Sequence, residues 1–215
     1  MSEQTLKRAR STEAKAEKRE TIVAAADIML RETGFDDFSM AGLAKRAGVA
    51  KGTLYLYFQT REEVFLELTN RLMDIWAETL TAEIKPGITD TEFCARFGAL
   101  ALRDPLLPEL ASRLTMLIEH NVSVDALVLS KRAWPDRVMT IANHLETALA
   151  LKPGQGLDLF AALTPLMIGA YSSELKAPDL IARLPDDVQG IICMNGFEER
   201  FAPAALLLLK GLRAS

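Results

Sequence analysis

The sequence contains few of the residues that carry covalent or metal chemistry. Its 215 residues include two histidines and two cysteines, and Cys94 and Cys193 lack the spacing of a metal site or a disulfide framework. No HExxH motif, phosphate-binding glycine loop or nucleophile elbow occurs. We therefore expect two buried thiols, no metal, no cofactor and no enzymatic activity.

Long apolar runs and strand-like patterns are also absent. No window of 18 uncharged apolar residues occurs, and the charged N-terminus lacks the apolar core of a signal peptide. We therefore expect no membrane segment and a place in the cytoplasm. No stretch alternates apolar and polar residues as a half-buried strand does, which predicts an all-α fold.

Basic residues are concentrated near the N-terminus. The net charge is −4, yet residues 1–61 carry 11 Lys and Arg against 8 Asp and Glu, whereas residues 62–215 carry 14 against 21. Because phosphates are neutralised locally, such a basic end allows an acidic protein to bind DNA. Before about Ser11 apolar periodicity is missing, which predicts either a mobile arm for the minor groove or a solubilising tail. The basic residues of this end are Lys7, Arg8, Arg10, Lys15, Lys18 and Arg19.

Residues 39–58, SMAGLAKRAGVAKGTLYLYF, predict two short helices joined by a turn of about three residues. Ser39 is placed to cap the first helix, and Gly48 suits the left-handed residue that follows a helix end. The second helix is expected over 51–57, with Leu54 and Phe58 facing the core. This arrangement is typical of a helix-turn-helix, although an ordinary helical pair with polar outer faces has a similar pattern.

The outward face of the second helix suits a nucleic acid chemically. Lys51 supplies charge for a phosphate, and Thr53 supplies a small hydroxyl for base edges or the backbone. Tyr55 and Tyr57 carry hydroxyls that reach phosphate oxygens. A solvated polar face is the other interpretation.

Residues 34–65 resemble the N-terminal DNA-binding signature of TetR-family transcriptional regulators. The glycine of the turn, the run KGTLYLYF and the acidic start of the following helix carry the resemblance. Ala50 departs from it, because relatives often have a serine there. The resemblance implies a TetR-like all-α fold with a helix-turn-helix DNA-binding domain over 1–61, including the basic arm, and a helical effector-binding and dimerisation domain over 62–215. It also implies DNA contacts by Lys51, Gly52, Thr53, Tyr55 and Tyr57, with Ser39 and Arg61 at phosphates.

The rest of the chain shows helical periodicity interrupted by proline and glycine. A first long helix is expected from about Ser11 to Thr33. Thr60 and Glu63 form a capping box that begins a fourth helix, which should end before Pro86. Further helices are expected over 91–103, 108–121, 124–151, 157–175 and 197–213, whereas 176–195 is either a loop or a short helix.

The segments 157–175 and 197–213 are apolar around most of their circumference. They form either the central core of a domain or half of a four-helix bundle between two subunits. The resemblance implies the bundle, and DNA reading favours two copies, because one short helix reads few bases. We therefore expect a homodimer on a palindromic operator. The candidate interface residues are Phe160, Ile168, Phe201, Ala204, Leu208 and Leu212.

An effector site is implied by the resemblance rather than by periodicity. Aromatic and methionine residues between the fourth helix and the two apolar segments could line an apolar cavity, although such residues are more often plain core. The candidates are Met73, Trp76, Phe97, Met116, His120, Trp134, Val138 and Tyr171. The expected effector is a small apolar or amphipathic molecule.

Taken together, these features predict a DNA-binding regulator, expected to be a repressor that a small-molecule effector releases from its operator. Two other functions are weighed against it. A constitutive DNA-binding protein would have the same head without an effector cavity. An enzyme using the helical cavity would need a catalytic constellation, and no motif for one is found.

Overall fold

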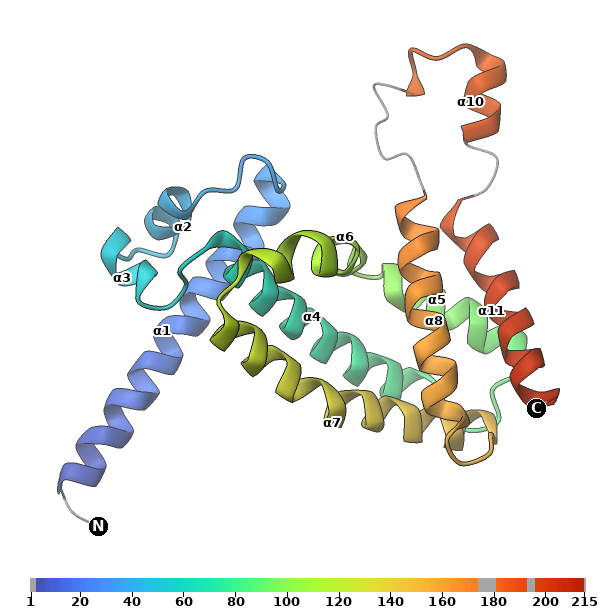
Figure 1. Cartoon of the computed structure of the whole chain (residues 1–215), viewed down its shortest axis with the longest axis horizontal. Coiled ribbons are helices and arrows are strands. Elements are labelled where there is room, and N and C mark those ends of the chain that lie inside the picture. Colours follow the sequence, from blue (N-terminus) through green and yellow to red (C-terminus); the bar gives the residue numbers. More distant parts are fainter. Residues whose placement is uncertain (1–2, 174–180, 193–195, 215) are drawn as a thin grey trace. The chain divides into compact units, whose positions relative to one another are not determined.

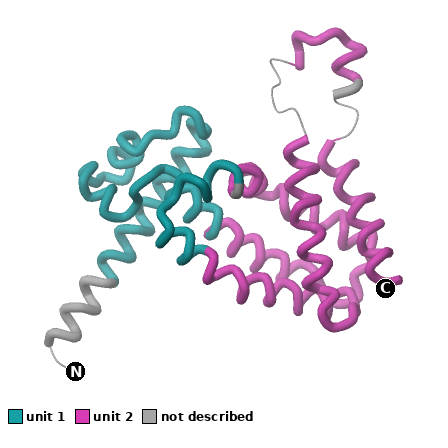
Figure 2. Tube along the Cα trace, in the orientation of Figure 1, with its two compact units in different colours: residues 1–70, 115–130 teal, residues 71–114, 131–215 magenta. Residues whose placement is uncertain are grey.

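The computed structural model describes residues 3–173, 181–192 and 196–214 of the chain. Every regular element in these ranges is helical, so the predicted all-α fold is confirmed (Figure 1). The chain divides into two compact units: residues 1–70 with 115–130 form unit 1, and residues 71–114 with 131–215 form unit 2 (Figure 2). No helix within the described ranges is long and apolar enough to cross a membrane.

Unit 1 contains the predicted helix pair. Its elements are α1 (Glu3–Thr33), α2 (Met40–Arg46), α3 (Lys51–Tyr55) and the first turns of α4 (Arg61–Glu83). Phe35 and Phe38 pack edge-on against Phe65, with ring centroids 5.2 and 4.9 Å apart. The apolar face of α1 completes this small core with Ile22, Val23, Ala26, Met29 and Leu30.

A second segment of the chain belongs to unit 1. It comprises most of a π-helical turn (Leu114–Ile118), a 3₁₀ turn (Glu119–Asn121) and the start of α7 (Val124–Leu149). Sequence periodicity predicted a continuous helix over 108–121. The structure corrects this, because α6 ends at Arg113 and is followed by the wider π-helical turn and then by the tighter 3₁₀ turn.

Unit 2 contains the later part of α4 and most of α7, together with α5 (Asp90–Leu102), α6 (Leu106–Arg113) and α8 (Gln155–Ser172). The chain ends with α10 (Asp186–Ile192) and α11 (Phe197–Ala214). The helix α11 packs against α5 and α8, which lie beside it in Figure 1, and α6 packs against α8.

Aromatic side chains fill the interior of unit 2. The Trp76 ring meets Phe97 nearly at a right angle, with centroids 5.3 Å apart, and Phe97 stacks on Phe201 at 5.8 Å. Gly98 permits this contact, because a Cβ there would lie 2.9 Å from the Phe201 ring. Cys94 is buried here as expected, and burial raises the pKa of its thiol to about 11. Cys193 lies outside the described residues.

Several helix boundaries differ from those predicted. The backbone is already helical at Glu3, whereas the sequence predicts that this helix begins near Ser11. Helix α3 ends at Tyr55 rather than at residue 57. In contrast, α4 ends at Glu83, before Pro86 as predicted. Of the segment 176–195, residues 186–192 form α10, while 176–180 and 193–195 lie outside the described residues.

Candidate nucleic-acid interface

The turn between α2 and α3 has the geometry that the sequence predicts. Ser39 has an extended backbone, and its Oγ accepts a hydrogen bond from the backbone N–H of Gly42 at 3.1 Å. Gly48 has a φ of 65°, which other residues reach only with strain. The backbone N–H of Val49 then donates to the carbonyl of Ala44 at 3.0 Å, which ends α2 and leads the chain into α3.

Contacts with the rest of unit 1 hold α3 in place. A helix of five residues is too short to be stable alone. Leu54 is 0% exposed and Phe58 is 1% exposed, so both face the core as predicted. Ala50 occupies the N-cap position, where it offers no side-chain oxygen to the first turn. The orientation of α3 therefore depends on the packing of Leu54 and Phe58 and on the hydrogen bonds made at the two ends of the helix.

The predicted DNA-contacting residues of α3 lie away from these anchors. Lys51, Gly52 and Tyr55 are exposed, whereas Thr53 and Tyr57 are half-buried. The neighbouring Leu56 is 78% exposed. Sequence periodicity gave no signal for Leu56, because a leucine in a helix normally faces the core. An exposed leucine at the C-terminal end of α3 offers an apolar contact of the kind that suits thymine methyl groups.

Ser39 and Arg61, the residues expected at phosphates, already bond within unit 1. The Ser39 hydroxyl accepts from Gly42, so its own proton can still be donated to a phosphate. Arg61 donates from Nη1 to the carbonyl of Phe35 at 3.3 Å and from Nε to Glu62 at 2.9 Å. These bonds orient both side chains at the ends of α2 and α4, and their phosphate roles remain predictions.

Glu63 is a buried carboxylate that connects the start of α4 to the segment before α7. Its Oε2 accepts from the backbone N–H of Gln59 at 2.6 Å, and its Oε1 accepts from the hydroxyl of Ser123 at 2.6 Å and the backbone N–H of Ser123 at 3.2 Å. Burial alone would raise the pKa of Glu63, but these hydrogen bonds and the charge of Arg19 outweigh it and lower the pKa. The hydroxyl of Thr60 accepts a hydrogen bond from the backbone N–H of Glu63 at 3.1 Å, which is one of the two bonds of the predicted capping box.

Arg19 was grouped by sequence with the basic N-terminal end, but its described contacts lie inside unit 1. It bonds Glu67 and the carbonyl of Tyr57, which are 48 and 38 residues away in sequence. Its guanidinium also lies over the ring of Phe58. Pairings over such separations leave no local pattern, so sequence reasoning missed both these contacts and those between Glu63 and Ser123.

The eight candidate effector residues are divided between the two units. Met116 and His120 belong to unit 1 and are exposed, Met116 by 79%. Met116 lies within the π-helical turn and His120 within the 3₁₀ turn after it, and their place in an effector cavity stays a prediction. Trp134 and Val138 are half-buried in unit 2, where Lys131 lies over the Trp134 ring. The remaining four, Met73, Trp76, Phe97 and Tyr171, are buried in unit 2.

A small apolar cleft of unit 2 lies against Trp76. Its volume is about 50 Å³, far below the several hundred that ligand pockets usually enclose. The Trp76 Nε1–H is buried and has no hydrogen-bond acceptor among the described residues. Such a group costs free energy until an acceptor reaches it. The cleft is lined by Leu72, Ile75, Trp76, Thr79, Leu100, Arg103, Asp104 and Leu107.

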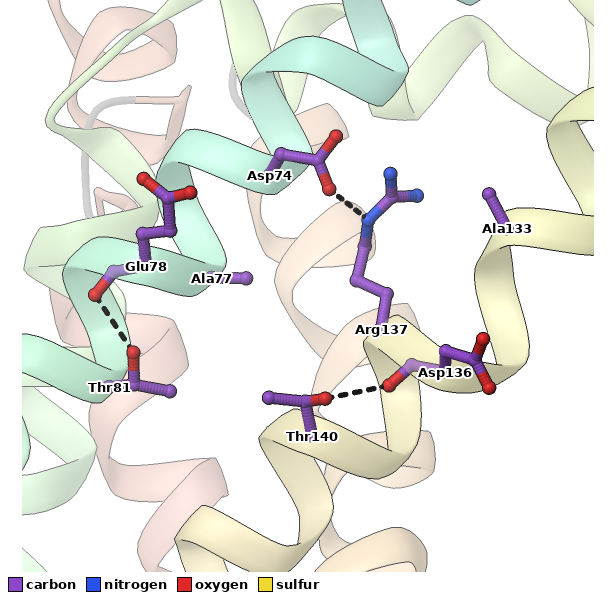
Figure 3. A pocket seen from close by; sticks show the side chains of 8 residues that line it. All are labelled: Asp74, Ala77, Glu78, Thr81, Ala133, Asp136, Arg137 and Thr140. Carbon is purple, nitrogen blue, oxygen red and sulfur yellow. Dashed lines mark hydrogen bonds and ion pairs between the residues drawn. The ribbon is translucent and has the colours of Figure 1, made fainter.

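A wider groove in unit 2 has charged side chains in its lining (Figure 3). Its volume is about 360 Å³, and α4 and α7 supply its walls. Arg137 donates from Nε to Asp74 Oδ1 at 2.5 Å, which joins the two helices within the unit. The exposed carboxylates of Glu78 and Asp136 also line it. No group of acidic, histidine or cysteine side chains suited to a metal ion occurs in the described parts of the chain.

The candidate interface residues of α8 and α11 fall into two classes. Phe160 and Phe201 are 4% and 0% exposed within the single chain. Both side chains have ring neighbours in the aromatic core of unit 2, and their role at a dimer interface stays a prediction. Leu208 is 41% exposed, and its neighbour Leu207 is 71% exposed. Ile168, Ala204 and Leu212 are half-buried.

Comparison with known proteins places both parts of the chain. Residues 22–68 match the family model of bacterial regulatory proteins of the tetR family, and residues 70–215 match a tetracyclin repressor-like C-terminal domain. The fatty acid metabolism regulator protein of Bacillus subtilis is 35% identical over 71 residues, 33% of this chain and 37% of that protein. The regulator EthR of Mycobacterium tuberculosis is 36% identical over 80 residues, 36% of each chain. The chain thus matches little more than a third of the length of these curated relatives.

Solved structures of similar fold cover nearly the whole chain. A TetR transcriptional regulator from Rhodococcus sp. RHA1 has a TM-score of 0.58 at 20% identity, covering 90% of this chain and 96% of its own. Thermus thermophilus FadR, a TetR-family transcriptional repressor in complex with lauroyl-CoA, has a TM-score of 0.55 at 20% identity, covering 89% and 92%. At such identities the likeness shows the shared fold.

Proposed function

The chain belongs to the TetR family of DNA-binding transcriptional regulators, and on that premise we propose that it is a repressor that binds a palindromic operator as a homodimer. The observation that supports this most is the α2–turn–α3 unit, whose exposed face carries Lys51, Gly52 and Tyr55 while Leu54 and Phe58 anchor it. The domain over 1–61 is proposed to read DNA in the cytoplasm, and the domain over 62–215 to bind effector and partner subunit.

Selection of bound duplexes from a random pool by the full-length chain tests this function. We expect an inverted repeat whose half-sites lie ~34–36 Å apart or a multiple of that spacing, because two recognition helices must meet the same side of the duplex. Recovery of a single unrepeated half-site would contradict the dimeric part of the proposal. Recovery of no preferred sequence would contradict operator binding itself.

The effector is proposed to bind unit 2 beside Trp76. The apolar cleft there and the buried Trp76 Nε1–H, which meets no acceptor in the described part of the chain, favour an apolar molecule with one hydrogen-bond acceptor, such as a carbonyl or carboxylate. Binding must enlarge the cleft, so it should favour a different conformation of unit 2 from the one described. By linkage, effector and operator should weaken each other's binding by the same factor.

A constitutive DNA-binding protein is the second candidate function, because the small volume of the cleft favours it. A thermal-unfolding screen against apolar acids, esters and amides separates the two. A ligand that raises the unfolding midpoint and weakens binding to the selected duplex supports the effector proposal. A chain whose midpoint stays unchanged across the screen supports constitutive binding.

A further inference from the structure

Arg19 connects α1, the end of α3 and α4 within unit 1. Its Nη2 lies 2.8 Å from Oε2 of Glu67, and its Nε lies 3.5 Å from Oε1 of the same carboxylate. Its Nη1 donates to the carbonyl of Tyr57 at 3.4 Å, and its guanidinium carbon lies 4.4 Å from the centroid of the Phe58 ring. We refer to Arg19, Tyr57, Phe58 and Glu67 as the Arg19 cluster.

These contacts act on the C-terminal end of the recognition helix. The last carbonyls of any helix lack partners within it, and α3 ends at Tyr55, two residues before the carbonyl that Arg19 binds. A planar guanidinium paired with a carboxylate holds a defined direction, which a flexible ammonium does not. Because α3 has five residues, a change of direction at this end tilts the whole helix.

We propose that Arg19 is a positioning residue for DNA reading, held by Glu67 and acting through Tyr57 and Phe58. The family match for the DNA-binding region begins at residue 22, so the family resemblance assigns no role to Arg19. Its place in the basic N-terminal end suggests a different role, as a phosphate ligand, and its 36% exposed side chain leaves that role sterically open. The proposal rests on the proposed operator binding.

The substitution Glu67→Gln separates the two roles by its effect on the preference for the selected duplex. The probes are the duplex selected by the full-length chain and a scrambled duplex of equal length and composition. The variant removes a negative charge, which strengthens binding to both duplexes by a similar factor whatever Arg19 does. If Glu67 holds Arg19 in place, the ratio of the affinity for the selected duplex to that for the scrambled duplex falls about tenfold. If Arg19 is a phosphate ligand, both duplexes bind more tightly and the ratio stays unchanged. The second result overturns the proposal.

Substitutions of Arg19 itself give a second measurement. We expect Arg19→Met and Arg19→Lys both to weaken binding to the selected duplex, with an unchanged slope of affinity against salt concentration. A phosphate ligand would instead lose about 0.9 from the slope in the Met variant and be rescued by lysine. The control is Arg31→Met, because Arg31 pairs with Asp27 one turn away on α1 at 2.9 Å. It should leave the preference for the selected duplex unchanged.

Stability and function are separated by measuring both. Unfolding midpoints show which variants are folded at the temperature of the binding experiment. Folded variants that keep the wild-type preference would show that the Arg19 cluster serves stability alone, and the positioning role would be overturned. A wild-type chain without any preference would contradict operator binding and with it the positioning role. A wild-type chain with a preference that the variants keep contradicts the positioning role alone.

Discussion

At the scale of one residue, Gly52 allows a DNA contact to be tested without interference from packing inside the chain. A Cβ added there meets no described atom within 4 Å, and its φ is not positive, so nothing inside the chain requires glycine. Gly52→Ala should therefore raise the free energy of unfolding by up to about 1 kcal/mol, because alanine favours helix. It should lower affinity for the selected duplex, because a close DNA backbone would meet the new methyl group.

Calorimetric or chemical unfolding and duplex binding check this prediction together. The matched control is Gly190→Ala in α10, a second exposed helical glycine with open space around its Cβ. It should gain similar stability without any change in DNA affinity. A Gly52→Ala chain that binds the selected duplex like the wild type would contradict a DNA contact at this position.

At the scale of elements, Glu63 joins the N-terminus of α4 to the residue that precedes α7. Glu63→Gln keeps the shape but replaces a carboxylate that accepts three hydrogen bonds with one amide oxygen and an NH₂ group. We expect a loss of about 1–3 kcal/mol in the free energy of unfolding, because buried donors lose their acceptor. Urea unfolding at neutral pH measures it.

The same carboxylate predicts a pH dependence. Hydrogen bonding holds the pKa of Glu63 in the folded chain below its usual value of 4.5, so the folded state favours the charged form. Its contribution to stability is present above about pH 4.5 and is lost as the pH falls through the lower, folded pKa. The acid-induced loss should be smaller in Glu63→Gln. The control is Glu62→Gln, which removes the neighbouring carboxylate that accepts a hydrogen bond from Arg61. If the acid-induced loss of stability were equally small in this control, the assignment to Glu63 would be contradicted.

At the scale of the whole molecule, the proposed dimer depends on the exposed part of α11. Leu208→Lys should raise the dissociation constant of the dimer at least about tenfold, because it removes apolar contact and places a charge in the interface. Sedimentation over a range of concentrations measures this, and the variant should also lose the preference for two half-sites. Leu129→Lys is the control, since Leu129 is 68% exposed on α7 in unit 1. An unchanged dimer in Leu208→Lys would contradict the interface.

Local patterns predicted the helix pair closely. Ser39, Gly48, Leu54 and Phe58 take their expected roles, because capping, left-handed turns and apolar periodicity depend on residues a few positions apart. The same reasoning was wrong about a continuous helix over 108–121, because helical spacing cannot show where a helix changes its turn.

Short-range sequence patterns are sufficient to predict an all-α chain, the position of its helix-turn-helix and the segments that form the most apolar helices. Each of these follows from short-range spacing and backbone preference. Tertiary structure alone decided that Phe160 and Phe201 pack inside one subunit, although they have the same apolar character as Leu208. It also decided that Arg19 meets Glu67 and that Glu63 meets Ser123, pairs 48 and 60 residues apart. Burial and long-range pairing depend on how helices pack, which no local pattern encodes.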